Sequence, residues 1–229
     1  MNDLVVIVEG ETEQTFVRLQ LAAHLALHNL NVWPVLPGRH RNHGGVKKWQ
    51  VAREDIIRTL REGRYCSTMF DYYRMPHDWP GRANSAALPW SKRAEHVELQ
   101  IGYEISSAMG DRFRPEFFIP YVQLHEFEAL LFADVEQLIK VVSPLSKHSA
   151  IYLRNQFTNI LAEAGHPEAI DDGYETCPSR RISKIVPAYK KRAQGPIIAD
   201  KIGIDGLRSQ CTHFGEWLTR LEQIDSGGT

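Results

Sequence analysis

The chain has 229 residues, of which 43% are hydrophobic and 24% are charged. This composition excludes an intrinsically disordered or low-complexity protein, and the length is sufficient for one large domain with a full core. Lysine and arginine together number 27, and aspartate and glutamate 28. The net charge of −1 excludes polyanion binding through bulk charge, so any nucleic-acid surface has to be local.

The cysteines and the apolar segments narrow the class of protein further. Cys66, Cys177 and Cys211 are isolated from one another, which excludes a disulfide scaffold and a zinc-finger spacing. The first apolar run is short and ends in acids, unlike a signal peptide, and no run reaches the about 18 apolar residues that span a bilayer. We expect a cytoplasmic protein.

The first 70 residues alternate between predicted strands and helices. A continuous aliphatic run predicts a buried strand over 4–8, and further strands are predicted over 31–36 and 65–70. Apolar residues at helical spacing predict helices over 12–27, capped by Thr12, and over 49–60. This order favours an α/β fold with a parallel sheet and right-handed crossovers.

The remainder of the chain is predicted to be mostly helical. Three prolines predict an irregular excursion over 75–89; a helix from Ser91 to Met109, a fourth strand over 117–124 and a helix over 126–132 follow. Further helices are predicted over 135–142, 149–164, 179–192, 197–202, 204–211 and 214–224. We expect an α/β core over residues 1–133 and a helical C-terminal region over 134–229 packed on it. A separate subdomain is the weaker alternative, because no linker divides the two.

Acidic residues follow three of the predicted strands. They are Glu9, Glu11 and Glu13 after the first strand, Asp71 after the third, and Glu126 and Glu128 after the fourth. Because ligands of a parallel sheet bind beyond its carboxyl ends, we expect the acids to gather at one edge. Crowded carboxylates hold divalent cations, and oxygen ligands favour Mg²⁺ or Mn²⁺ over Zn²⁺. Such a site supports phosphodiester cleavage.

Compensation of helix dipoles is the competing interpretation for four of these acids. Glu11 and Glu13 lie in a first helical turn, and Glu126 and Glu128 at a strand-to-helix junction. Glu13 is four residues from Glu9 and can share its side, whereas Glu11 points away. Glu9 is the strongest candidate for a functional role, since it places a charge at the end of a buried strand and glycine follows it directly.

Several motifs resemble those of a known family. Residues 8–13, V-E-G-E-T-E, form an apolar strand that enters E-G-x-T-E and a helix, which resembles the opening motif of the Toprim domains of topoisomerases, bacterial primases and OLD-type nucleases. The second Toprim signature, D-x-D, is kept in part, because Asp71 is present and Tyr73 replaces the second acid.

Four further stretches, 69–76, 123–132, 171–181 and 213–218, resemble one branch of these proteins. That branch is a Toprim-like family of unassigned function, whose small members are commonly encoded beside an OLD/ABC-type ATPase in phage-resistance loci. The resemblance covers nearly the whole chain.

The resemblance implies a metal-dependent, nuclease-like site. Glu9 would be a metal ligand or general base, and Asp71 would bind Mg²⁺. Glu13 is a further catalytic candidate because of its spacing from Glu9. A phenol is a poor Mg²⁺ ligand, so Tyr73 leaves three alternatives open: Glu126 or Glu128 supplies the missing carboxylate, the site binds one metal, or it is no longer catalytic.

Basic residues concentrate in two segments. Arg39, Arg41, Lys47 and Lys48 flank a glycine-rich loop, and Arg180, Arg181 and Lys184 precede the run Lys190–Arg192. Both segments are candidates for nucleic-acid binding, although a solvated face explains the second slightly better. No Walker A motif is present, so we expect no ATP hydrolysis, and His40 and His43 lack the partners of a zinc site.

We therefore expect a Mg²⁺- or Mn²⁺-dependent nuclease that acts on DNA or RNA as the effector of an anti-phage pair with an ATPase. Nucleotidyl transfer ranks lower because no zinc module is present. The alternative from a different class is a non-catalytic binding or regulatory subunit of an ATPase complex. A homodimer contact through Phe214, Trp217, Leu218 and Leu221 stays open.

Overall fold

The computed structural model describes residues 1–38, 48–170, 173 and 175–225. A parallel sheet runs through it, with strands β1 (Asn2–Val8), β2 (Leu30–Val35), β3 (Tyr65–Asp71), β4 (Phe118–Ile119) and β5 (Val122–Gln123). The strand order is β2-β1-β3-β4, and β5 also pairs with β3. All pairs are parallel, so the predicted α/β class is confirmed.

The fourth strand is not continuous over 117–124 as predicted, because Pro120 and Tyr121 separate β4 from β5. Pro120 has no N–H to donate to a neighbouring strand. At this gap, the side chain of Thr68 on β3 forms hydrogen bonds with the backbone of Tyr121. Its Oγ1 donates to Tyr121 O over 2.8 Å and accepts from Tyr121 N over 2.9 Å.

One long helical segment connects β1 to β2. It consists of α1 (Glu11–Phe16), a π-helical stretch (Val17–Leu21) and α2 (Ala22–Ala26). Gly10 is the N-terminal cap, so the prediction of Thr12 as the cap is wrong. The chain is extended at Gly10, and the helix therefore starts as soon as the strand ends.

The other helices have the following bounds: α3 (Trp49–Arg61), α4 (Arg82–Ser85), α5 (Trp90–Met109), α6 (Phe127–Leu130), α7 (Val135–Val142), α8 (Ala150–Ala164), α9 (Pro178–Ile185), α10 (Lys191–Ile202), α11 (Ile204–Gln210) and α12 (Thr212–Glu222). Short 3₁₀ turns occupy Gly110–Arg112, Pro115–Phe117, Leu131–Ala133, Ser143–Leu145, Pro167–Ala169 and Gln223–Asp225.

The single helix predicted over 179–192 is wrong. Helix α9 ends at Ile185, and α10 begins at Lys191 and continues through the predicted 197–202 segment. Pro187 explains the break, because proline disfavours the helical conformation of the residue before it. Val186 accordingly has φ −128° and ψ 87°.

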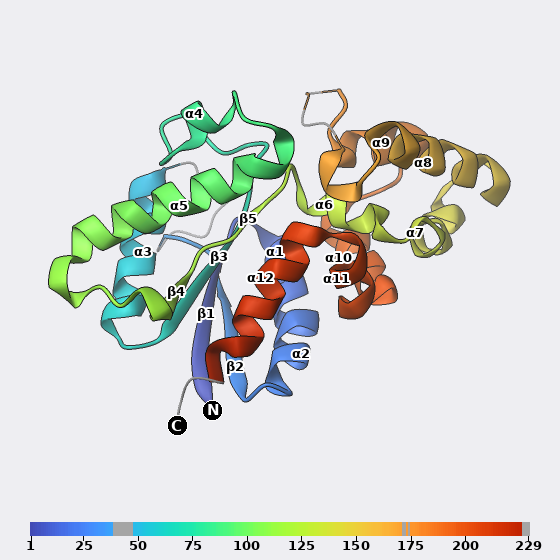
Figure 1. The fold of residues 1–229 in the computed structure, drawn as a ribbon. Coiled ribbons are helices and arrows are strands. Elements are labelled where there is room, and N and C mark those ends of the chain that lie inside the picture. Colours follow the sequence, from blue (N-terminus) through green and yellow to red (C-terminus); the bar gives the residue numbers. More distant parts are fainter. Residues whose placement is uncertain (39–47, 171–172, 174, 226–229) are drawn as a thin grey trace.

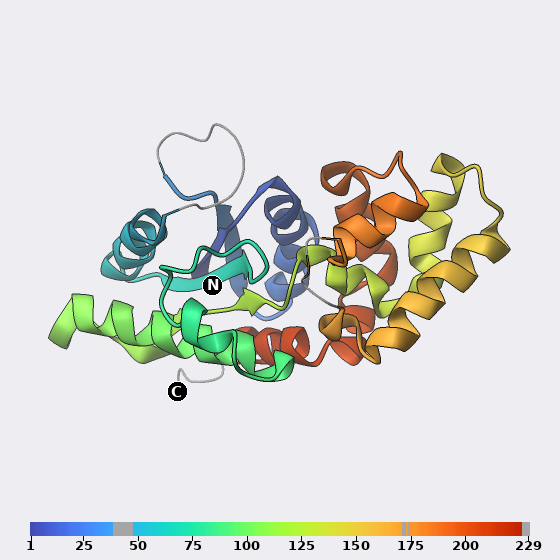
Figure 2. The same cartoon turned by 90° about the horizontal axis from the view of Figure 1, so that it is seen from above.

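Helices cover both faces of the sheet (Figures 1 and 2). Val5 and Ile7 of β1 pack in one apolar cluster with residues of α3 and α5. Leu4, Val6 and Val8 point to the other face and pack with α1, α2 and α12. The helices from α6 to α11 extend outward on this second side (Figure 2).

The C-terminal helix α12 returns to the sheet. Trp217 Nε1 donates to Ser67 Oγ on β3 over 2.9 Å, and its ring stacks on Tyr121 with centroids 4.2 Å apart. Residues from both sides of position 133 thus share one apolar cluster. Phe214, Trp217, Leu218 and Leu221 are buried in that cluster, so this face belongs to the core and is not a dimer contact. Within the described residues, the helices are too short or too polar to cross a bilayer.

Candidate functional site

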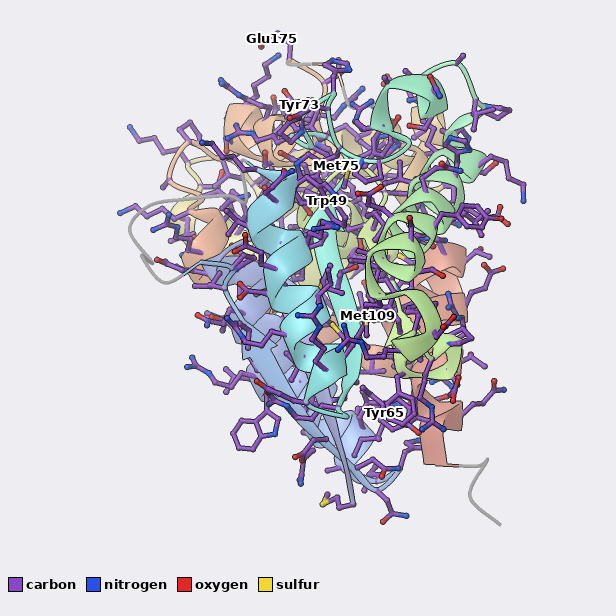
Figure 3. The ribbon with its side chains drawn as sticks, turned by 90° about the vertical axis from the view of Figure 1, so that its left-hand side faces the viewer. Trp49, Tyr65, Tyr73, Met75, Met109 and Glu175 are labelled. Carbon is purple, nitrogen blue, oxygen red and sulfur yellow. The ribbon has the colours of Figure 1, made fainter. Side chains whose placement is uncertain are left out.

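Five acids gather at the carboxyl edge of the sheet. They are Glu9 at the end of β1, Glu13 on α1, Asp71 at the end of β3, and Glu126 and Glu128 at the start of α6. In Figure 3, Tyr65 and Tyr73 lie at opposite ends of β3, and the acids follow the end marked by Tyr73. Glu9 is partly buried, and the other four acids are at most 5% exposed. We call these five residues the acidic cluster.

Backbone N–H groups orient three of these carboxylates. Asp71 N donates to Glu9 Oε2 over 2.9 Å, Phe127 N donates to Asp71 Oδ1 over 3.0 Å, and Ser179 N donates to Glu126 Oε2 over 3.0 Å. Each carboxylate has a second oxygen that these bonds do not use. Fixed acceptors with a spare oxygen are the arrangement in which outer hydrogen bonds hold metal ligands in place.

The junction between β5 and α6 allows Glu126 and Glu128 to join the same cluster. His125 has φ 63°, a left-handed conformation that is uncommon outside glycine, and Tyr73 N donates to its carbonyl over 2.9 Å. Glu126 is still extended, with φ −141° and ψ 160°, and the helix begins only at Phe127. The two glutamates are therefore not constrained to the faces of one regular helix.

Two buried carboxylate oxygens of the cluster have no hydrogen-bond donor within the described part of the chain. They are Glu13 Oε1 and Glu128 Oε2. A Cβ at Gly10 would lie 3.1 Å from Glu13 Oε2, so the glycine leaves room for this side chain. Burying a charged oxygen without a partner costs several kcal/mol unless a proton or a cation compensates.

Burial and mutual repulsion raise the pKa values of these acids. Burial, and then the charge of Glu13, raise the pKa of Glu9 to about 7. Burial raises the pKa of Glu128 to about 7, with a further contribution from Glu126. The pKa of Asp71 rises well above its ordinary value through burial and the charges of Glu13 and Glu9. The pKa of Glu13 is also raised, chiefly by burial.

Lys191 supplies positive charge to the cluster. Its Nζ lies 4.0 Å from Glu128 Oε2, and its side chain is 44% exposed. Partial burial works to lower the pKa of Lys191, but the charges of Glu128, Asp71 and other acids outweigh it and hold that pKa above its ordinary value. Lys191 is exposed, as on a solvated helix face, and its charge also acts on the acids.

Close packing of α10 on α1 places Lys191 beside the acids. A Cβ at Gly195 would lie 3.3 Å from Thr12 Cγ2, so the missing side chain permits this approach. Pro187 was the signal in the sequence that could have located Lys191. It ends α9 and makes Lys191 the first residue of a new helix.

Two other predicted positions lie differently from the cluster. Glu11 is exposed and pairs with Arg192 over 3.0 Å, in keeping with its direction away from Glu9. Tyr73, at the second D-x-D position, has a raised pKa because of burial and its neighbours Cys177 and Glu126. Glu126 is thus near the place of the missing acid.

The predicted basic residues in the described part of the chain lie in two separate segments. Arg39, Arg41 and Lys47 lie outside the described residues. Lys48 is exposed before α3, and Arg180 is partly buried on α9. Arg181 donates to Thr176 O and lies 3.4 Å from Glu163 Oε2, while Lys184 lies 3.0 Å from Glu175 Oε2.

Arg74 was missed by the sequence reasoning. It is exposed just beyond β3, and its charge lowers the pKa of Glu9. The sequence signal for Arg74 was its position, three residues after Asp71.

The donor atoms of the acidic cluster are of the type that Mg²⁺ and Mn²⁺ prefer. All the donors are carboxylate oxygens, two of them lack a hydrogen-bond donor in the described chain, and the negative charge exceeds that of Lys191. In the described residues, no three acids of the cluster place one carboxylate oxygen each within 4.8 Å of the other two. Among the described residues, His24, His28 and Glu222 are the group that meets this spacing.

Comparisons with known proteins give the chain a family. The C-terminal region of the OLD protein of Xanthomonas campestris pv. campestris is a similar solved structure, with 15% identity over 97% of this chain and 95% of that one and a TM-score of 0.45. No curated protein matches the chain. A family model described as "Domain of unknown function (DUF4276)" matches residues 8–222. The chain therefore belongs to the DUF4276 family.

Proposed function

We propose that the acidic cluster is the active site of a Mg²⁺- or Mn²⁺-dependent nuclease that cleaves phosphodiester bonds of DNA or RNA. One observation carries the proposal. Glu9, Asp71 and Glu126 come from three separate chain segments, and each has one oxygen fixed by a backbone N–H and a second oxygen available. A cluster that served only to compensate helix dipoles would lie at the surface, whereas this one is mostly buried.

The residues divide into ligands and reacting groups. Asp71 and Glu126 would hold the cation, with Glu13 and Glu128 completing its oxygen shell. A bound Mg²⁺ or Mn²⁺ would neutralise charge on the phosphate oxygens. Glu126 would take the place of the acid that Tyr73 replaces in D-x-D, since the two residues are close enough for the Glu126 charge to raise the pKa of Tyr73.

Glu9 and Lys191 would act on the phosphate directly. The pKa of Glu9, at about 7, suits a general base, which accepts the proton of the attacking water as the oxygen attacks phosphorus. The P–O bond to the leaving sugar oxygen then breaks, and that oxygen takes a proton from solvent. Lys191 would stabilise the added negative charge, and Arg74 would attract the nucleic-acid backbone.

The motif resemblance extends the proposal to the biological setting. Stretches of this chain resemble small Toprim-like proteins that are encoded beside an ATPase in phage-resistance loci. We propose that this protein is the effector of such a pair in the cytoplasm and that its activity depends on an ATPase partner.

A cleavage assay tests the proposal. The substrates are plasmid, single-stranded DNA and total tRNA, each with Mn²⁺ and then Mg²⁺. Glu9→Gln and Asp71→Asn should abolish cleavage, because they keep size and one acceptor oxygen but remove the charge. Glu11→Gln is the matched control, since Glu11 lies in the same segment and pairs with Arg192 outside the cluster.

If the wild type does not cleave, the protein is either an enzyme that needs its partner or a protein without a metal site. Calorimetric titration with Mn²⁺ distinguishes the two. Binding that Asp71→Asn abolishes would identify an enzyme that waits for its partner. The absence of binding would reject the metal site. The protein would then be a non-catalytic regulatory subunit, an alternative that Tyr73 in place of an acid favours.

A further inference from the structure

A second group of metal-ligating side chains joins the first long helix to the last one. His24 lies on α2, His28 lies in the turn that follows α2, and Glu222 ends α12. His24 Nε2 lies 2.7 Å from Glu222 Oε1, and His28 Nε2 lies 3.7 Å from the same oxygen. The three ligand atoms are all within 4.8 Å of one another.

This group lies at the opposite edge of the sheet from the acidic cluster. Asn2 N donates to Asn29 O over 3.0 Å, so the turn that follows His28 is beside the first residue of β1. The acidic cluster begins after the last residue of β1, and seven extended residues separate the two edges by about 20 Å. In Figure 1, α2 and the last turn of α12 both lie toward the end of the sheet where the chain begins. The two groups are therefore independent.

We propose that His24, His28 and Glu222 form a binding site for a transition-metal ion of the zinc type. Two imidazole nitrogens and one carboxylate oxygen are a common set of protein ligands for Zn²⁺, unlike the oxygen-only set of the acidic cluster. The two imidazole rings lie side by side, with their centroids 5.4 Å apart. The His28 side chain is 36% exposed, which leaves access for water as a fourth ligand.

Arg208 competes with a metal at this site. Its guanidinium contacts Glu222 Oε1, the oxygen that both histidines face. A cation at Oε1 would repel Arg208, which would have to move to the other carboxylate oxygen. The site thus predicts opposite effects of two substitutions: removing a histidine weakens metal binding, and removing Arg208 strengthens it.

The consequence of binding would be a cross-link between distant parts of the chain. His24 and Glu222 are separated by 198 residues, so the metal would close a very long loop and attach α12 to α2. Metal that binds only the folded state adds its binding free energy to the stability of the protein.

Zinc titration against a chromophoric chelator, in excess Mg²⁺ to occupy the oxygen sites, tests the proposal. The wild type should bind one more equivalent of Zn²⁺ than His24→Ala or His28→Ala, and Zn²⁺ should raise its Tm by several degrees. Co²⁺ should give the intense visible absorption of a four-coordinate site. His77→Ala, which removes an exposed histidine elsewhere, should behave as the wild type.

Arg208→Gln supplies a result that loss of folding cannot imitate. Its Zn²⁺ Kd should fall by about tenfold, because a competing cation is gone. Equal zinc stoichiometry in the wild type and both histidine variants would overturn the proposal. So would a wild type that shows neither Zn²⁺ binding nor the Co²⁺ absorption, or an Arg208→Gln Kd that is unchanged or higher.

Discussion

The backbone N–H of Asp71 donates a hydrogen bond to Glu9 Oε2 over 2.9 Å, which connects the ends of β3 and β1. The carboxylate of Asp71 accepts in turn from Phe127 N, and so connects the sheet to α6. Three chain segments are therefore aligned by backbone donors at the place where their acids meet. Because these donors need an acceptor but not a negative charge, the charge and the architecture can be tested separately.

Asp71→Asn should separate the effect of the negative charge from that of the hydrogen-bonded architecture. The amide keeps an oxygen for Phe127 N but removes a charge that burial and the neighbouring acids disfavour. We expect cleavage to fall by about 100-fold or more, and the free energy of unfolding without metal at about pH 8 to rise by about 1–2 kcal/mol. Urea denaturation measures the second effect. A less stable Asp71→Asn protein at that pH would show that the charge itself supports the fold.

The stability of the metal-free protein should fall as the pH rises. The pKa of Glu9 and that of Glu128 are about 7 in the folded protein, against 4.5 ordinarily, so the folded state holds extra protons between these values. The contribution of these protons to the free energy of unfolding is complete below pH 4.5 and is lost as the pH rises past about 7. Its upper bound is about 3 kcal/mol for each acid. Urea denaturation at several pH values, with and without Mn²⁺, measures this, and Mn²⁺ should reduce the loss.

A double variant is the control for this pH dependence. Burial lowers the pKa of His213, but its hydrogen bond to Glu98 and nearby charges outweigh burial and raise it, so His213 contributes in the same direction. Glu9→Gln combined with Glu128→Gln should remove the contribution of these two acids and leave that of His213. A wild type whose stability increases over this pH range would contradict the raised pKa values.

Lys191→Met should destabilise the protein only where the acids are charged. At about pH 8 and without metal, we expect a loss of about 1–2 kcal/mol, a modest value because the lysine is partly exposed. At about pH 5 most of the loss should vanish, since Glu9 and Glu128, whose pKa values are about 7, are then largely protonated. Thermal unfolding at both pH values measures it. Lys190→Met, which changes the neighbouring exposed residue, should have little effect at either pH.

Local patterns predicted the order of the elements. The aliphatic run of β1, the glycine after Glu9 and the largely apolar segment that ends in Asp71 are visible in the sequence, and they place Glu9 and Asp71 at one edge of a parallel sheet. Boundaries were missed where proline interrupts a pattern, at Pro120 and at Pro187. In both places the side-chain periodicity continues across a residue that the backbone cannot pass regularly.

Long-range contacts account for most of the remaining differences. Ser179 N reaches Glu126, and Lys191 reaches Glu128, across more than 50 residues of sequence in each case. Neither contact follows from the periodicity of its own helix. The approach of α10 to α1 depends on Gly195, whose small size is informative only once its neighbour Thr12 is known.

Thr68→Val should reveal how the gap between β4 and β5 is stabilised. Valine has nearly the shape of threonine, but it leaves the buried backbone N–H and carbonyl of Tyr121 without the two hydrogen bonds from Thr68 Oγ1. An unsatisfied buried group costs about 1–3 kcal/mol, so we expect a loss of about 2 kcal/mol in the free energy of unfolding, measured with urea.

Thr59→Val is the control. The buried Thr59 hydroxyl only adds a bond to the Asp55 carbonyl within α3, and its loss should cost less than about 1 kcal/mol. Equal losses in the two variants would show that Tyr121 finds other partners, and that the interrupted strand does not depend on Thr68.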